Sequence, residues 1–144
     1  MVKKAEAADA GKIAGLAVLL WSAHTEQELA REFSDAMEQG KGQFFLKYAQ
    51  GIPVGFAQCA LRYDYVEGTQ TSPVGYLEGI FVQEAYRRRG SAGELLSECE
   101  KWARQRGCRE FASDCEAVND GSFRFHMAAG FEEATRIICF TKKL

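Results

Sequence analysis

The segment Gly75–Leu96 constrains the fold of this chain most, because a β-rich run enters an Arg-Gly turn that opens directly into an amphipathic helix. The first N–H groups of a helix have no partners within it and carry partial positive charge. The amides of residues 89–93 can therefore converge on a phosphate, and Gly90 and Gly93 let a ligand approach the backbone closely. The segment predicts an anion site at a strand–helix junction, with a solvated arginine run before an ordinary turn as the alternative.

This anion site does not match the common nucleotide-binding loops. The turn lacks the Gly-Lys-Ser/Thr ending of a Walker loop, and no three-glycine dinucleotide fingerprint follows a strand. A formal net charge of −2 also disfavours broad nucleic-acid binding, although Arg87, Arg88 and Arg89 follow one another. We therefore expect another kind of phosphate-bearing ligand and no nucleic-acid partner.

Length and composition predict one domain over residues 1–144. The chain has 47% hydrophobic residues, enough for a proper core, and no apolar run long enough to cross a membrane. Residues 1–12 lack the continuous apolar stretch of a secretory signal, so we expect a cytoplasmic location. The five cysteines form no Cys-x-x-Cys pair and several lie in apolar runs, which predicts buried free thiols and no metal site.

Hydrophobic periodicity predicts a mixed α/β order. Asp9 and Thr25 are the expected caps of the first two helices, and Gly107 is expected to end the third. A whole helix separates the strands at 76–82 and 110–114, so these two should run parallel. The predicted strands span 2–5, 43–49, 54–62, 76–82, 110–114 and 131–144, and the predicted helices span 9–20, 25–39, 91–106 and 122–129.

This order, with RRRGSA after the fourth strand, resembles the GCN5-related N-acetyltransferase superfamily over the whole chain. Its signature, Arg or Gln, two residues, Gly, one residue, then Gly or Ala, is matched by Arg87, Gly90 and Ala92, and Asn119 and the AGF run at 129–131 add further pieces. More closely, the segments DYVEG, SPVGYLEGIFV, YRRRG, EFASD and AGFEEATR resemble the aminoglycoside 6′-N-acetyltransferases. The resemblance implies a central, mostly antiparallel mixed sheet with splayed fourth and fifth strands, flanked by helices.

The resemblance also implies an activity. Such an enzyme transfers an acetyl group from acetyl-CoA to a primary amine of an aminoglycoside, here expected to be the 6′-amine, by direct attack on the thioester and without a metal. Related enzymes are often homodimers, and the terminal strand could pair or exchange across such an interface. Two alternatives stay open: an acetyltransferase for a polyamine, protein N-terminus or lysine, and a coenzyme-A-binding module without catalysis.

Acetyl-CoA offers a pyrophosphate to the helix N-terminus and an amide-bearing pantetheine arm to a strand edge. The resemblance assigns the pyrophosphate to the turn, the arm to the end of the fourth strand, and a second contact with the arm to Asn119, which could instead be a simple helix cap. Gly79 suits a bulge in that strand. The residues expected to contact acetyl-CoA are Ile80, Phe81, Val82, Arg88, Arg89, Gly90, Ser91, Ala92, Gly93 and Asn119.

Glu78 is the expected substrate anchor and proton acceptor. A charged residue inside an apolar strand is costly unless it faces a ligand or a partner, and an ammonium nucleophile must lose a proton before it can attack. Asp114 is expected to lie beside it and add a second negative charge for a polycation. The alternatives are an ion pair between Glu78 and an arginine, and a turn or cap role for Asp114.

The family positions that line the sugar-binding cleft correspond here to Trp21, His24 and Tyr65. Each has a structural alternative: Trp21 could cover the first helix, His24 could be an exposed loop residue, and Tyr65 could pack under its own loop. His126 stands where many superfamily members have a tyrosine proposed to protonate the departing thiolate, so it is a candidate acid. A lone histidine on a helix can also be purely structural.

Overall fold

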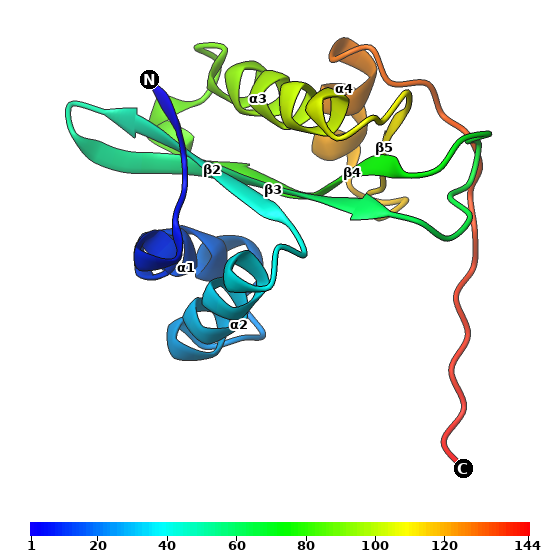
Figure 1. The fold of residues 1–144 in the computed structure, drawn as a ribbon, viewed down its shortest axis with the longest axis horizontal. Helices are drawn as coiled ribbons and strands as arrows, with labels where there is room; N and C mark the ends of the chain where they lie inside the picture. Colours follow the sequence, from blue (N-terminus) through cyan, green and yellow to red (C-terminus); the bar gives the residue numbers. More distant parts are fainter.

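The computed structural model describes residues 1–144 and builds them around one five-stranded sheet in the order β1-β2-β3-β4-β5, with α1 and α2 on one face and α3 and α4 on the other (Figure 1). Two short 3₁₀ turns, η1 and η2, precede α1 and α3. The strands are β1 (Val2–Lys4), β2 (Gln43–Ala49), β3 (Ile52–Arg62), β4 (Val74–Val82) and β5 (Phe111–Ser113), and the helical elements are η1 (Ala7–Asp9), α1 (Ala10–Leu20), α2 (Glu26–Glu38), η2 (Glu84–Tyr86), α3 (Ser91–Gln105) and α4 (Asp120–Ala128).

Helix ends follow the expected local chemistry with one correction. Thr25 and Glu28 form the predicted capping box at α2, and Gly107, with φ of 85°, follows the end of α3 in the left-handed conformation. Asp9 does not cap α1 through its side chain. Its carboxylate instead accepts the backbone N–H of Glu6 at 3.0 Å, because the extra 3₁₀ turn places that amide within reach.

Each face of the sheet has its own hydrophobic core. α1 and α2 bury residues such as Ile13 and Phe33 against one face, and α3 buries Leu95, Cys99 and Trp102 against the other. Fully burying a side chain of the size of Leu95 stabilises the fold by about 1.5–3 kcal/mol. No helix combines the length and hydrophobicity needed to cross a lipid bilayer.

The fourth strand carries two irregularities that shape the candidate site. β4 pairs in parallel with β5 only from Gly75 to Leu77, so its remaining half has no neighbour on that side. In the antiparallel ladder with β3, Gln58 faces Gly79 while Cys59 faces Leu77. Glu78 is therefore the extra residue of a β-bulge, which agrees with the bulge expected next to Gly79.

The C-terminal segment departs from the sequence-based prediction. Residues 131–144 form no strand, and the chain runs away from the body of the molecule (Figure 1). Ile137, Ile138 and Phe140 are 70%, 80% and 88% exposed. The apolar pattern predicted a sixth strand, but a strand needs a neighbouring edge and this segment meets none within its own chain.

The prediction of buried thiols holds for only part of the cysteines. All five are free, and Cys59, Cys99 and Cys108 are buried, whereas Cys115 and Cys139 are exposed. The two exposed thiols lie in the loop after β5 and in the C-terminal segment, where no second layer of structure covers them.

Candidate active site

A hollow of about 260 Å³ lies at the N-terminus of α3. Arg88 and Gly90 have φ of 62° and 80°, so the chain turns sharply and presents the first amides of α3 to the hollow. A Cβ added at Gly90 or Gly93 would meet no atom within 4 Å, which leaves the space in front of these residues open. The hollow is lined by Val82, Arg87, Arg88, Gly90, Ser91, Ala92, Gly93 and Phe125.

Two of the three consecutive arginine side chains contact the protein. Arg87 Nε donates to the carbonyl of Val82 at 2.6 Å, and the Arg89 guanidinium lies 5.9 Å from the centre of the Tyr86 ring. The Arg87 contact fastens the turn to the end of β4. An anion in this hollow would therefore be held mainly by main-chain donors and the helix dipole.

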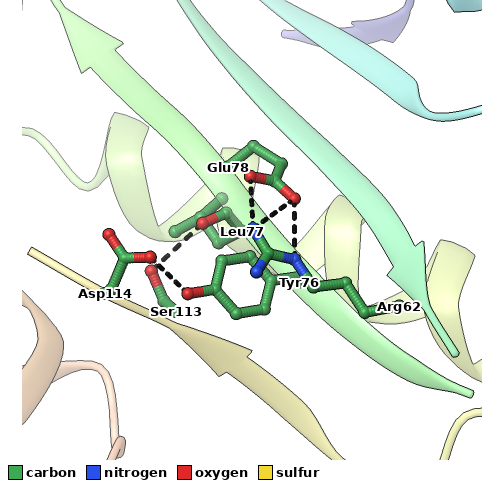
Figure 2. Close-up of polar contacts among 6 residues, drawn as sticks. All are labelled: Arg62, Tyr76, Leu77, Glu78, Ser113 and Asp114. Atoms are coloured by element: carbon green, nitrogen blue, oxygen red, sulfur yellow. Dashed lines mark hydrogen bonds and ion pairs between the residues drawn. The ribbon is translucent and has the colours of Figure 1, made fainter. Parts of the chain in front are cut away.

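Glu78 is engaged by an arginine in the unliganded protein. Arg62 Nε and Nη2 donate to Oε1 at 3.1 and 3.0 Å, and Nη2 also reaches Oε2 at 2.9 Å (Figure 2). The Arg62 guanidinium carbon lies 3.5 Å from the centre of the Tyr76 ring. The ion pair left open as an alternative therefore exists, although the Glu78 side chain is still 27% exposed and can meet a ligand.

Asp114 is held by a phenol rather than by a turn or a helix end. Tyr76 donates its hydroxyl to an Asp114 carboxylate oxygen (Figure 2). Burial and then the Asp114 contact raise the pKa of Tyr76 above its ordinary value, so the phenol keeps its proton at neutral pH. Arg62, stacked on that same ring, links the two acids into one group. Two carboxylates and one guanidinium leave the group one net negative charge.

The three expected cleft residues have different environments. Trp21 packs edge-on against Phe56 with ring centres 5.9 Å apart, and its ring lies where a Cβ on Gly79 would be, at 2.6 Å. It thus helps form the core and also covers the bulge. His24 is exposed, with Nδ1 3.7 Å from a Glu28 oxygen. Tyr65 is 74% exposed and does not pack under its loop.

Asn119 and His126 both bond within α4 or to β5. Asn119 Oδ1 accepts the backbone N–H of Ser122 at 3.1 Å, which is the cap role left open above. His126 Nδ1 lies 2.7 Å from the Ser122 carbonyl oxygen, and Nε2 lies 2.8 Å from Ser113 Oγ. No group of three or more His, Cys, Asp or Glu side chains is placed to hold a metal ion.

Three residues of this site were not anticipated from the sequence. Tyr76 carried a usable signal, because it precedes Glu78 by two positions in the same predicted strand and side chains at that spacing share a face. Arg62 gave no signal, since its contact depends on the register between β3 and β4. Ser113 ends a short strand and meets His126 only through the packing of α4.

Glu110 fixes the loop that carries Tyr65, and this arrangement gives a testable pH dependence. Its Oε1 atom accepts the backbone N–H groups of Gln70 and Thr71 at 2.8 Å each, together with the Thr71 hydroxyl. These bonds, the Thr71 hydroxyl first, hold the pKa of Glu110 below its ordinary value. A depressed folded-state pKa means that the stabilisation is complete above the unfolded-state pKa, about 4.3, and is lost as the pH falls through the folded-state value.

We expect Glu110→Gln to speed hydrogen exchange of the Gln70 and Thr71 amides at pH 7, because a neutral amide oxygen is a weaker acceptor than a carboxylate. In the parent protein, the same protection should fade as the pH falls below 4, after correction for intrinsic exchange. Mass spectrometry of peptides covering the loop measures both effects. Unchanged protection in the variant would contradict this role for Glu110.

Comparison with known proteins gives a consistent result. The profile described as "Acetyltransferase (GNAT) family" matches residues 8–131. The aminoglycoside N(6')-acetyltransferase type 1 of Salmonella typhimurium is 38% identical over 129 residues, covering 90% of this chain and 89% of that protein. The protein of the same name from Stenotrophomonas maltophilia is 40% identical over 146 residues, covering 99% and 93%.

A solved structure is similar along the whole chain. AAC(6')-Iy in complex with the bisubstrate analog CoA-S-monomethyl-acetylneamine matches with a TM-score of 0.94 at 34% identity, covering 100% of this chain and 98% of that chain. The similarity includes the N-terminal helices, the sheet and the C-terminal segment. The structural comparison and the sequence comparisons therefore point to the same family.

Proposed function

The chain belongs to the acetyltransferase (GNAT) family, and from this premise we propose that it transfers an acetyl group from acetyl-CoA to the 6′-amine of an aminoglycoside. The observation that carries the proposal is the adjacency, along β4, of an anion-binding helix N-terminus and a paired carboxylate site. Relatives named for this reaction are 38% and 40% identical to the chain.

Acetyl-CoA would bind along the unpaired half of β4. The backbone of Ile80, Phe81 and Val82 has no strand on the β5 side and can bond the amides of the pantetheine arm. The pyrophosphate would lie in the hollow at α3, on the amides of residues 89–93 and beside Arg88. Asn119 keeps its amide N–H groups for the arm, because its cap bond uses only the carbonyl oxygen.

The amine would be received at the bulge. Glu78 binds the ammonium and takes its proton, directly or through water, while Asp114 supplies the second negative charge for a polycation. Arg62 occupies part of the Glu78 carboxylate, which leaves about one of its four lone-pair sites free for a new donor. Trp21, His24 and Tyr65 would contact the sugar rings, and His126 would assist the departing thiolate.

Acetylation would remove a positive charge and a hydrogen-bond donor from the drug. Aminoglycosides bind ribosomal RNA as polycations, so the product would bind RNA less tightly and the antibiotic would be inactivated. The cytoplasmic location expected from the sequence fits this role and is part of the proposal.

The deciding experiment measures acetyl-CoA-dependent thiol release with aminoglycosides that differ only in a 6′-amine or a 6′-hydroxyl. We expect release with the 6′-amino compounds, including kanamycin and tobramycin, and none with their 6′-hydroxyl counterparts. Equal release with both would place the reaction at another amine. Release with a polyamine or a lysine peptide alone would favour the other acceptors, and coenzyme A binding without release would favour a non-catalytic module.

A homodimer also belongs to the proposal. The extended C-terminal segment exposes Ile137, Ile138 and Phe140, and an unpaired apolar strand is a template for pairing with another chain. A second copy supplies the same segment, so the two can cover each other across a two-fold axis.

We expect the double variant Ile138→Asp/Phe140→Asp to have half the mass of the parent in light scattering, because charged side chains cannot be buried in such an interface. Thr141→Asp places a charge on the face of the extended segment opposite Ile138 and Phe140, keeps both apolar groups and should stay dimeric. A parent protein that already has the mass of one 16.0 kDa chain would exclude the dimer.

A further inference from the structure

A chain of hydrogen bonds links α4, β5 and β4. It runs from the Ser122 carbonyl to His126 Nδ1 at 2.7 Å, from Nε2 to Ser113 Oγ at 2.8 Å, and from Ser113 Oγ to the Leu77 carbonyl at 3.2 Å. The two end groups are carbonyl oxygens, which can only accept. The Nδ1 atom must therefore carry a hydrogen, and Nε2 faces the serine hydroxyl.

The number of protons in this series of hydrogen bonds decides which group can donate one. Three links need three hydrogens, whereas a neutral imidazole and one hydroxyl supply two. With a neutral imidazole, the Ser113 hydroxyl can donate either to Nε2 or to the Leu77 carbonyl, but not to both. With a doubly protonated imidazole, Nε2 donates to Ser113 Oγ, the hydroxyl donates to Leu77, and all three hydrogen bonds form. Moving one proton between His126 and Ser113 therefore needs no movement of heavy atoms.

His126 has no free ring nitrogen with which to meet a ligand, since both bond to the protein. Ser113, by contrast, lies where its hydroxyl can meet a ligand. It ends β5 opposite Leu77, which is the last position of β4 that pairs with β5, and from the next residue on β4 has no neighbour on that side (Figure 2). The hydroxyl thus lies where the two strands part. Its link to Leu77 is the longest of the three and the easiest to exchange for a new partner.

We propose that Ser113, rather than His126, delivers the proton to the sulfur of the departing coenzyme A, and that His126 resupplies it; this rests on the acetyl-transfer function proposed above. As the carbon–sulfur bond breaks, sulfur keeps the electron pair and takes the Ser113 hydroxyl proton. Oγ takes the Nε2 proton in the same motion, which leaves a neutral imidazole. Solvent returns a proton to Nε2, and the whole reaction of ammonium and thioester to amide and thiol releases one proton.

The kinetic test separates delivery of a proton from support of the fold. We expect Ser113→Ala to lower kcat about tenfold, which is less than the roughly 10²–10⁴-fold typical of acid–base catalysis because thiolates leave readily, with KM for both substrates unchanged. Ser113→Thr keeps the hydroxyl and should recover most of kcat. Ser113→Ala/His126→Asn should cost no more than either change alone, because the two residues act as one unit. Ser34→Ala, a half-buried serine on α2, is the control for loss of a hydroxyl.

A spectroscopic test does not depend on the amine acceptor. The chain has two histidines, so a ¹⁵N-histidine spectrum contains two imidazoles, and His126 is assigned by its absence in His126→Asn. Adding coenzyme A should shift the His126 Nε2 resonance in the parent, because the Ser113 hydroxyl turns toward the sulfur and its oxygen then accepts the hydrogen bond from Nε2. The resonance should stay unchanged in Ser113→Ala.

The outcomes against the proposal are distinct from failure of the proposed function. Full kcat in Ser113→Ala, additive losses in the double variant, or the same Nε2 shift with and without Ser113 would each overturn it. An acetyl group found on Ser113 by mass spectrometry would overturn it too, since the hydroxyl would then be a nucleophile. Lack of thiol release by the parent with every aminoglycoside defeats the proposed substrate instead, and the Nε2 shift still tests the relay.

Discussion

Glu78→Ala is expected to lower kcat/KM for aminoglycosides by about 10²–10⁴-fold, the range associated with loss of a positioned acid or base. The change removes the carboxylate at the β4 bulge and leaves the Arg62 guanidinium without its partner. A free positive charge would then stand where the ammonium must bind, so both binding and proton removal suffer. Steady-state kinetics with a 6′-amino aminoglycoside measures the loss, and coenzyme A affinity should stay within about threefold of the parent.

A second variant separates the two causes of this loss. In Glu78→Ala/Arg62→Met the repelling guanidinium is also absent, so KM should recover while kcat stays low. Glu98→Ala, which breaks the exposed pair with Lys101 on α3, is a matched control and should keep parent kinetics. If Glu78→Ala retained full activity, proton removal would have to occur in solvent and the proposed role of the bulge would be wrong.

Gly93→Asp is expected to weaken coenzyme A binding about 30-fold or more while raising the melting temperature. Two like charges 4 Å apart repel by about 4 kcal/mol at an effective dielectric of 20, and half of that repulsion accounts for the loss. The fold should gain, because an acidic side chain in the first turn of a helix is favourable and glycine is a poor helix residue. Calorimetric titration with coenzyme A and thermal unfolding measure the two opposite effects.

Two control variants separate the effect of the charge from the effects of its position and of losing glycine. Gly11 lies in the first turn of α1 and also has open space around its Cα, so Gly11→Asp should stabilise the protein and leave coenzyme A affinity unchanged. Gly93→Ala adds only a methyl group and should keep affinity within about threefold, with up to about 1 kcal/mol of added stability. Unchanged affinity in Gly93→Asp would mean that the pyrophosphate binds elsewhere.

Local patterns predicted most of the fold. The strand at Gln43–Ala49 has its predicted bounds, and the capping box of Thr25 and Glu28 starts α2 as expected. Both features could be predicted because turns, helix caps and alternating hydrophobicity depend on residues that are close in the sequence. The prediction of a C-terminal strand was wrong for the single chain. An apolar pattern indicates that a segment will be buried, but it does not indicate which edge or chain covers the segment. The bulge was anticipated beside Gly79, and its extra residue is Glu78.

The site was predicted less completely than the fold, and the reason is long-range register. Glu78 and Asp114 were selected as isolated acids in unusual positions, but their partners Arg62 and Tyr76 become neighbours only through the pairing of β3, β4 and β5. His126 was singled out as an acid by family position. The backbone carbonyl four residues before it could have been foreseen from helix geometry, whereas the hydroxyl of Ser113 could not.

The close fit between Trp21 and Gly79 limits how drug preference can diversify in this lineage. A side chain at position 79 would meet the Trp21 indole at 2.6 Å, so the indole or β4 would have to shift. If the bulge receives the amine as proposed, selection for new antibiotics has little freedom at position 79. Adaptation should accumulate instead around Tyr65, which is 74% exposed and lies in the loop proposed to contact the sugar rings, where changes alter ring preference and leave the chemistry unchanged.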